Sequence, residues 1–280
     1  VALGASRASG THSFAAAIGD NGSSYGASGA NSVAMSYQAK ATQSYAFAQG
    51  YQAQATGNSS VAMGFQAESS SGIAFGYKGR ANGLRSFGVN NNTNGGATGN
   101  FSTAIGDGCL SSSTYSHAIG VGAQASGTGS WATGLRTDTN GVIGKHVWSG
   151  VALSGNNDGA TQTGTTVLAI ATTDATATAL TTSADTADAT NQLIVNNNSA
   201  YAFTGTIVAR QKASEGTASA AWKVEGLIRR EANAGTTVLV ASTVTALSNA
   251  PSWGMALTAD TTNGCLKIAA TINTSEVLYA

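Results

Sequence analysis

The stretch Ser60-Val61-Ala62-Met63-Gly64-Phe65-Gln66-Ala67 decides the fold, because close copies of it recur along the first half of the chain. Each copy has a central alanine between two larger residues, with small residues outside them. The central alanine advances by 14 residues from Ala34 to Ala48 to Ala62, and again from Ala104 to Ala118 to Ala132. The anchors of the repeat are Ala34, Ala48, Ala62, Ala74, Ala104, Ala118 and Ala132.

Side chains alternate in size within each copy. Val61, Met63 and Phe65 fall on one face, whereas Ala62 and Gly64 fall on the other. A period of two predicts a β-strand. Two very short strands and two corners in about 14 residues describe one rung of a parallel β-coil. The small residues predict a coil too narrow to hold larger side chains.

The energetics of such a narrow coil favour association. Ordering each residue costs about 1–2 kcal/mol, while burying a mid-sized apolar side chain contributes only about 1.5–3 kcal/mol. A single thin coil is therefore marginal, and we expect identical coils to associate. A wider monomeric solenoid is the alternative, but about 14 residues per turn leave little interior space.

Composition narrows the possible partners. Charged residues are only 9% of the 280 residues, and 13 Lys and Arg balance 13 Asp and Glu. This neutral chain is not expected to bind nucleic acid. No apolar run approaches the ~18 residues that span a bilayer, so we expect no membrane insertion. Cys109 and Cys265 lie in different halves and are predicted to be free thiols. The chain begins within a repeat, which indicates a fragment of a longer protein.

The repeats resemble a known family. The segments SVAMGFQA (60–67) and SHAIGVGAQA (116–125) are similar to the head repeats of YadA-like trimeric autotransporter adhesins. For residues 1–137, this resemblance implies a left-handed parallel β-roll that associates as a homotrimer. An insertion at residues 90–96 departs from the pattern, and we expect it to protrude as a loop.

The 14-residue register is lost after Leu135, and residues 138–280 show short apolar runs separated by Gly, Asn and Asp. This pattern predicts an antiparallel β-sandwich. Residues 197–210, 226–230 and 257–264 resemble C-terminal domains of bacteriophage tail-fibre proteins, which implies a trimeric tip on a virion fibre. A YadA-like adhesin is expected to continue into a coiled-coil stalk and a barrel. Neither pattern is present, and this favours the phage interpretation.

The chain shows no motif that indicates catalysis. His12, His117 and His146 are scattered without metal-ligand spacing, and His117 is expected to be an ordinary rung residue. Asp20 and Asp107 each follow Ile-Gly and are expected to cap corners rather than form a carboxylate pair for glycoside hydrolysis. We therefore predict no catalytic residues, no cofactor and no metal site.

Aromatic and amide side chains are the candidates for binding a receptor, because they stack on sugars and hydrogen-bond to them. Trp222 alternates with charged residues in a strand and is expected in the core, whereas Trp253 follows a proline turn and is expected to be exposed. The receptor-contact candidates are Trp253, Trp148, Asn91, Asn92 and Asn94.

These features together predict an extracellular attachment protein. We expect a homotrimeric tail fibre of a phage virion that joins other tail or baseplate proteins and binds a bacterial surface glycan or protein. Three weak sites acting together would supply the affinity. The alternatives are a bacterial trimeric surface adhesin and an enzyme, a tailspike that cleaves polysaccharide. Sparse acidic residues and short rungs count against the tailspike.

Overall fold

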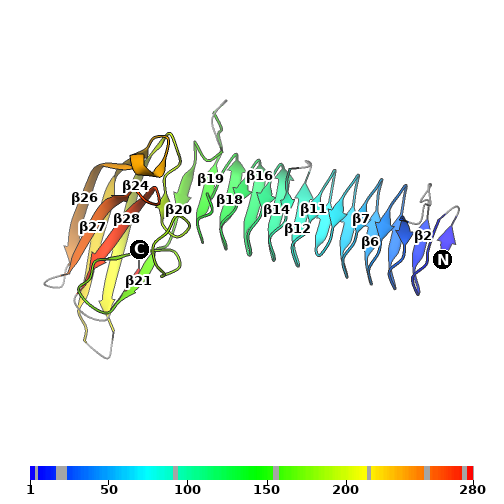
Figure 1. The fold of residues 1–280 in the computed structure, drawn as a ribbon, viewed down its shortest axis with the longest axis horizontal. Helices are drawn as coiled ribbons and strands as arrows, with labels where there is room; N and C mark the ends of the chain where they lie inside the picture. Colours follow the sequence, from blue (N-terminus) through cyan, green and yellow to red (C-terminus); the bar gives the residue numbers. More distant parts are fainter. Residues whose placement is uncertain are drawn as a thin grey trace. The chain divides into compact units, whose positions relative to one another are not determined.

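The computed structural model describes residues 1–3, 6–16, 24–90, 94–153, 158–212, 216–248, 253–272 and 276–279. The chain is all-β, and a 3₁₀ turn at Ala234–Thr236 is the only helical element among these residues. It forms two compact units (Figure 1). The first contains Val1–Thr139 and His146–Gly164, and the second contains Asn140–Lys145 and Thr165–Ala280.

The first unit is a parallel β-solenoid whose rungs follow one another in sequence order (Figure 1). Its larger sheet contains β1 (Ala2–Leu3), β2 (Phe14–Ala16), β4 (Val33–Met35), β6 (Phe47–Gln49), β8 (Val61–Met63), β10 (Ile73–Phe75), β12 (Phe87–Asn90), β14 (Thr103–Asp107), β16 (His117–Val121), β18 (Trp131–Leu135), β19 (His146–Ser149) and β20 (Thr163–Thr165). Its smaller sheet contains β3 (Gly26–Ala27), β5 (Lys40–Ala41), β7 (Gln54–Ala55), β9 (Glu68–Ser69), β11 (Arg80–Ala81), β13 (Gly96–Ala97), β15 (Leu110–Ser111) and β17 (Gln124–Ala125).

The strand register confirms the repeat anchors. Ala48 pairs with Ala34 on one side and Ala62 on the other, and Ala118 lies in the same way between Ala104 and Ala132. The seven anchor alanines are fully buried. Neighbouring rungs stack so closely that the interior is built mainly from alanine and serine, with a few larger buried residues such as Cys109 and Val147.

Serine occupies the position before most strands of the larger sheet, where its hydroxyl accepts or donates a hydrogen bond at the corner. Ser102 Oγ donates to the Gly99 carbonyl at 2.6 Å, and Ser116 Oγ donates to the Ser113 carbonyl at 2.6 Å. Both serines are essentially buried. Each hydroxyl is thereby paired inside the coil, where a buried polar group without a partner would be costly.

The solenoid departs from a strict 14-residue period and extends beyond residue 137. Ala62 pairs with Ala74 after only 12 residues, and Gly88 pairs with Ala104 after 16. Ala132 pairs with Val147 after 15, so that β19 continues the parallel ladder. In this last rung Val147 and Ser149 stand where the preceding rung has Ala132 and Gly134, so the alanine and glycine of the repeat are missing from it.

The second unit contains antiparallel strands in two sheets. The first sheet has the order β21-β29-β24-β25-β26, and in the second β28 lies beside β22, β23 and β27. The strands are β21 (Ala169–Thr172), β22 (Thr178–Ala179), β23 (Leu193–Ile194), β24 (Ser199–Gln211), β25 (Ser219–Arg230), β26 (Val238–Ser248), β27 (Gly254–Asp260), β28 (Cys265–Thr271) and β29 (Glu276–Tyr279). Both sheets contribute to one buried cluster that includes Ile207, Val224 and Ile268.

Candidate functional site

The outer side of the larger solenoid sheet carries two columns of apolar side chains. In each strand the residues before and after the buried centre point outward, because side chains alternate along a strand. We call this surface the apolar face. It contains Val33, Met35, Phe47, Val61, Met63, Ile73, Phe75, Phe87, Val89, Ile105 and Ile119, all partly or fully exposed. Polar residues such as Gln49 and Thr133 interrupt it without adding charge. Contiguous exposed apolar surface of this kind marks an interaction site.

The last rungs of the apolar face carry an aromatic cluster. The rings of His117 and Trp131 lie 5.4 Å apart, and those of Trp131 and His146 lie 5.7 Å apart. Trp148 on the neighbouring column is 62% exposed. His117 pairs with Thr103 and Trp131 as one member of the column, which confirms its prediction as a rung residue. No group of three potential metal ligands occurs in the described part of the chain.

The outer side of the smaller sheet is different in character. Its outward column contains Lys40, Gln54, Glu68 and Arg80, followed by Leu110. Arg80 Nε lies 3.7 Å from Glu68 Oε2, and both side chains are well exposed, so this ion pair adds little stability. The two outer sides of the solenoid thus offer one apolar and one largely polar surface.

One corner of the solenoid combines an aromatic stack with a chain of glutamine amides. Ring centroids are 5.2 Å apart between Tyr37 and Tyr51, 4.9 Å between Tyr51 and Phe65, and 5.0 Å between Phe65 and Tyr77. The next residue in each of the first three rungs is a glutamine. A groove of about 230 Å³, which we call the corner groove, is lined by Tyr25, Gln38, Gln52, Gln54, Gln66 and Glu68.

The sequence interpretation missed the corner groove, although its signal was present. An aromatic residue followed by glutamine recurs at Tyr37-Gln38, Tyr51-Gln52 and Phe65-Gln66, one rung apart. Side chains at equal positions of successive rungs lie side by side, so a repeated dipeptide predicts two parallel rows of like side chains.

The structure corrects one of the proposed receptor contacts. Trp253 is only 8% exposed and belongs to the buried cluster of the second unit, so the expectation that it lies exposed after a turn is wrong. Trp253 directly precedes β27, which pairs with the largely buried strand β28. This pairing places the Trp253 ring in the core. Trp222 is 3% exposed in the same cluster, as predicted.

The other receptor-contact candidates differ in whether the structure describes them and how exposed they are. Trp148 is exposed on β19 as described above, and Asn94 is also exposed. Asn91 and Asn92 lie outside the described residues. Asn90, at the start of the predicted loop, is buried and donates from Nδ2 to the Cys109 carbonyl at 3.2 Å. Trp148 belongs to the first unit and Trp253 to the second.

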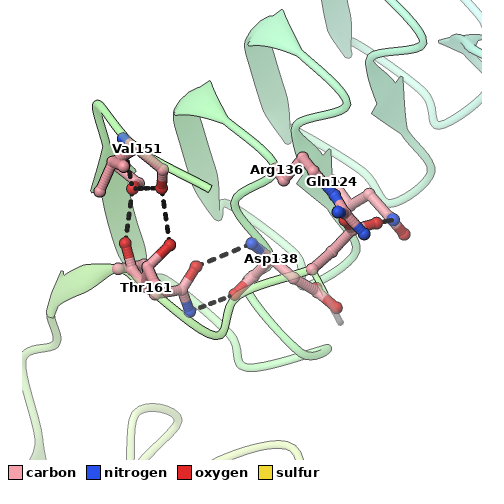
Figure 2. Close-up of polar contacts among 8 residues, drawn as sticks. Gln124, Arg136, Asp138, Val151 and Thr161 are labelled. Atoms are coloured by element: carbon pink, nitrogen blue, oxygen red, sulfur yellow. Dashed lines mark hydrogen bonds and ion pairs between the residues drawn. The ribbon is translucent and has the colours of Figure 1, made fainter. Parts of the chain in front are cut away.

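A network of polar contacts closes the last rungs of the solenoid (Figure 2). Asp158 accepts hydrogen bonds of 2.6 Å from Gln124 Nε2 and Arg136 Nε, which also forms an ion pair with it. Gln162 bonds to both backbone groups of Asp138, each at 2.8 Å. Charge-assisted and paired contacts of this kind are among the stronger hydrogen bonds. They hold the segment before β20 against the end of the coil.

Among the described residues of the second unit, β26 is a long strand at the edge of its sheet. β26 forms the outer strand of the first sheet, and its eleven residues contain no charge and no proline. Val240 is 47% exposed and Leu247 is 60% exposed. Edge strands are usually protected by charge, proline or short length, because open backbone groups can pair with another strand. β26 has none of these protections.

Both cysteines are free and fully buried, as expected of thiols without partners. Burial raises the pKa of Cys265 to about 12, and it also raises the pKa of Cys109. Neither thiol is therefore activated as a nucleophile. In the described part of the chain, no helix is both long and apolar enough to cross a membrane.

Comparison with known proteins leaves the chain without an assigned family. No protein-family model matches the sequence, and no curated protein matches it.

Proposed function

We propose that this chain is part of a non-enzymatic, homotrimeric attachment fibre of a bacteriophage virion. In this proposal the solenoid is the trimeric, left-handed β-roll that its repeats resemble. The second unit is a β-sandwich tip, and the protein binds a bacterial surface glycan or protein outside the cell. Other tail or baseplate proteins hold the fibre on the particle.

The apolar face is the observation that carries the proposal. The interior of the solenoid is filled by alanine and serine, whereas its valine, isoleucine, methionine and phenylalanine side chains lie outside. Full burial of one such side chain contributes about 1.5–3 kcal/mol. In the single chain these side chains are only partly buried, so much of this stabilisation is gained only on association. The face holds enough of these side chains for association to outweigh its entropic cost.

A second copy of the same chain is the partner that fits this face best. The two columns continue over rungs from Val33 to Ile119 with a nearly constant spacing. A partner can contact both columns along their whole length only if its own surface repeats with the same rise per rung. An identical coil has this rise. A rotation axis parallel to the solenoid makes the contacts of all copies equivalent. That three copies associate is what the resemblance of the repeats to YadA-like trimeric adhesins implies.

The mass in solution tests the assembly. Light scattering after size exclusion should give three times the chain mass of 27.7 kDa. The double variant Met63→Glu with Ile105→Glu should be monomeric, because six carboxylates would meet at the axis. Leu110→Glu, the same exchange on the smaller sheet, is the control and should remain trimeric. A monomeric wild-type protein would overturn the trimer.

Two further measurements test whether the protein is a non-enzymatic attachment protein of a virion. The labelled trimer should bind host cells without shortening their surface polysaccharide, and turnover of that polysaccharide would support a tailspike instead. Peptides of the parent protein should occur in purified virions. Recovery from the bacterial cell envelope instead would identify a surface adhesin.

A further inference from the structure

We infer that the corner groove binds a neutral glycan chain running across the rungs, along the axis of the solenoid. This inference rests on the proposed attachment function and names a ligand class and a site for it. The groove crosses the rungs that contain Gln38, Gln52 and Gln66, and it lies beside the outward residues of β7 and β9.

The glutamine row is held in a fixed arrangement. Gln52 Nε2 donates to Gln38 Oε1 at 2.8 Å, and Gln66 Nε2 donates to Gln52 Oε1 at 2.7 Å. Each amide has two N–H donors and two acceptor sites, so the row uses only part of this capacity. The remaining donors and acceptors are oriented before a ligand arrives, which lowers the entropic cost of binding.

The backbone shows that glutamine is not the least strained choice at this corner. Gln38, Gln52 and Gln66 have φ angles of 53°, 55° and 53°, in the left-handed region. The equivalent corners of later rungs have Gly108 and Gly122, both with φ 65°. A non-glycine residue there costs about 1–2 kcal/mol. Lys78 and Arg136 take the same corner in other rungs with φ 54° and 52°, so the left-handed backbone belongs to the corner, and the three successive glutamines are distinguished by their bonded amides.

The aromatic stack forms a firm wall next to the amide row. Tyr37, Tyr51, Phe65 and Tyr77 are each 40–48% exposed, and their neighbours cover most of the ring faces within the stack. The stacked rings hold the corner in place but are not among the residues that line the groove, where the amides supply the hydrogen bonds. Tyr25 adds a phenol to the lining of the groove.

The chemistry of the lining selects the ligand class. Amide groups pair with hydroxyl groups as both donors and acceptors, and Glu68 is the only charged residue among those that line the groove. One carboxylate disfavours phosphate or acidic sugars, so a neutral sugar fits best. A volume of about 230 Å³ is below the about 300–1,000 Å³ that enclose drug-sized ligands, as suits a short part of a longer chain.

The spacing of the row supports a chain rather than a single sugar. Neighbouring strands lie about 4.8 Å apart, so the amides recur at about that interval. This interval is close to the length of one pyranose unit in an extended glycan, and successive units can meet successive glutamines. The groove lies beside the smaller sheet and leaves the apolar face free for association.

Binding to oligosaccharides tests the inference on the full chain. The probes are cellohexaose and chitohexaose, which are neutral and extended, together with an array of neutral bacterial O-antigen chains. We expect the wild-type protein to bind a neutral extended chain. Gln52→Gly should weaken that binding about five- to tenfold, because it removes one or two hydrogen bonds.

The control is Arg85→Gly. Arg85 is another left-handed residue, with φ 53°, and it is not one of the residues that line the groove. Both variants should keep the wild-type mass in solution and circular dichroism. The inference is overturned if no neutral oligosaccharide binds, or if Gln52→Gly binds as tightly as Arg85→Gly. Either result, obtained with an intact trimer that still attaches to cells, would leave the proposed function standing.

Discussion

Gly120 offers the sharpest test of the rung packing. It has φ +134° in β16, and a Cβ built there would lie 2.1 Å from the carbonyl oxygen of Gly134 in the next rung. Non-bonded contacts with carbon are normal from about 3.5 Å, so Gly120→Ala must push the rungs apart by more than about 1 Å. The neighbouring bonds from His117 N to the Ser130 carbonyl and from Arg136 N to the Val121 carbonyl, at 2.9 and 2.8 Å, would stretch.

The expected cost follows from these two effects. Losing two or three ladder bonds costs about 1 kcal/mol each, and an alanine at this φ adds about 1–3 kcal/mol. Gly120→Ala should therefore lower the free energy of unfolding by about 3–6 kcal/mol. Gly129→Ala is the matched control, because Gly129 has φ +64° and no atom within 4 Å of the added Cβ. It should cost only about 1–2 kcal/mol.

Urea unfolding and hydrogen exchange measure the difference. Amides of residues 117–135 should exchange faster in Gly120→Ala than in Gly129→Ala, since the damage is confined to the rungs on either side. If the free energies of unfolding of the two variants differ by less than about 1 kcal/mol, the rungs can separate at little cost. The close stacking of the rungs would then not explain the glycine at position 120.

Three further predictions concern other parts of the chain. Asp158→Ala should cost about 1–2 kcal/mol and speed proteolysis at the end of the solenoid, because two charge-assisted bonds are lost. Cys109 and Cys265 should resist iodoacetamide at pH 8 until urea unfolds the chain. Because the unfolded Cys265 thiol ionises near 9.0 but the buried one only near about 12, the free energy of unfolding should fall as the pH rises from 9 to 12. Val240→Lys with Val244→Lys should reduce concentration-dependent light scattering while preserving circular dichroism, since charge protects an open edge.

The repeat made the solenoid predictable because one physical rule acts in every rung. A buried alanine such as Ala62 must meet another small residue above and below, so its spacing reports the register directly. β19 escaped prediction because Val147 and Ser149 replace the central alanine and the glycine of the repeat, and because it follows one residue later than the 14-residue period.

Burial and grooves were harder to predict because they depend on contacts between distant residues. Trp253 looks like a turn residue in its own neighbourhood, and only the pairing of β27 with β28 brings it into the core. The corner groove depends on side-chain bonds between Gln52 and residues 14 positions away on either side. A sequence shows such residues at equal spacing, but the bond between them depends on which corner they occupy.

The changing width of the larger sheet has a mechanical consequence. Hydrogen bonds between rungs run along the stacking direction, so a pull along the solenoid loads every gap between rungs in series. The strands are three residues long at Val61–Met63 but five residues long at His117–Val121. Under tension the gaps with fewer bonds open first, and the earlier rungs give way before those nearer residue 120. A solenoid pulled from its two ends would then lengthen between its three-residue strands and keep the rungs with five-residue strands intact.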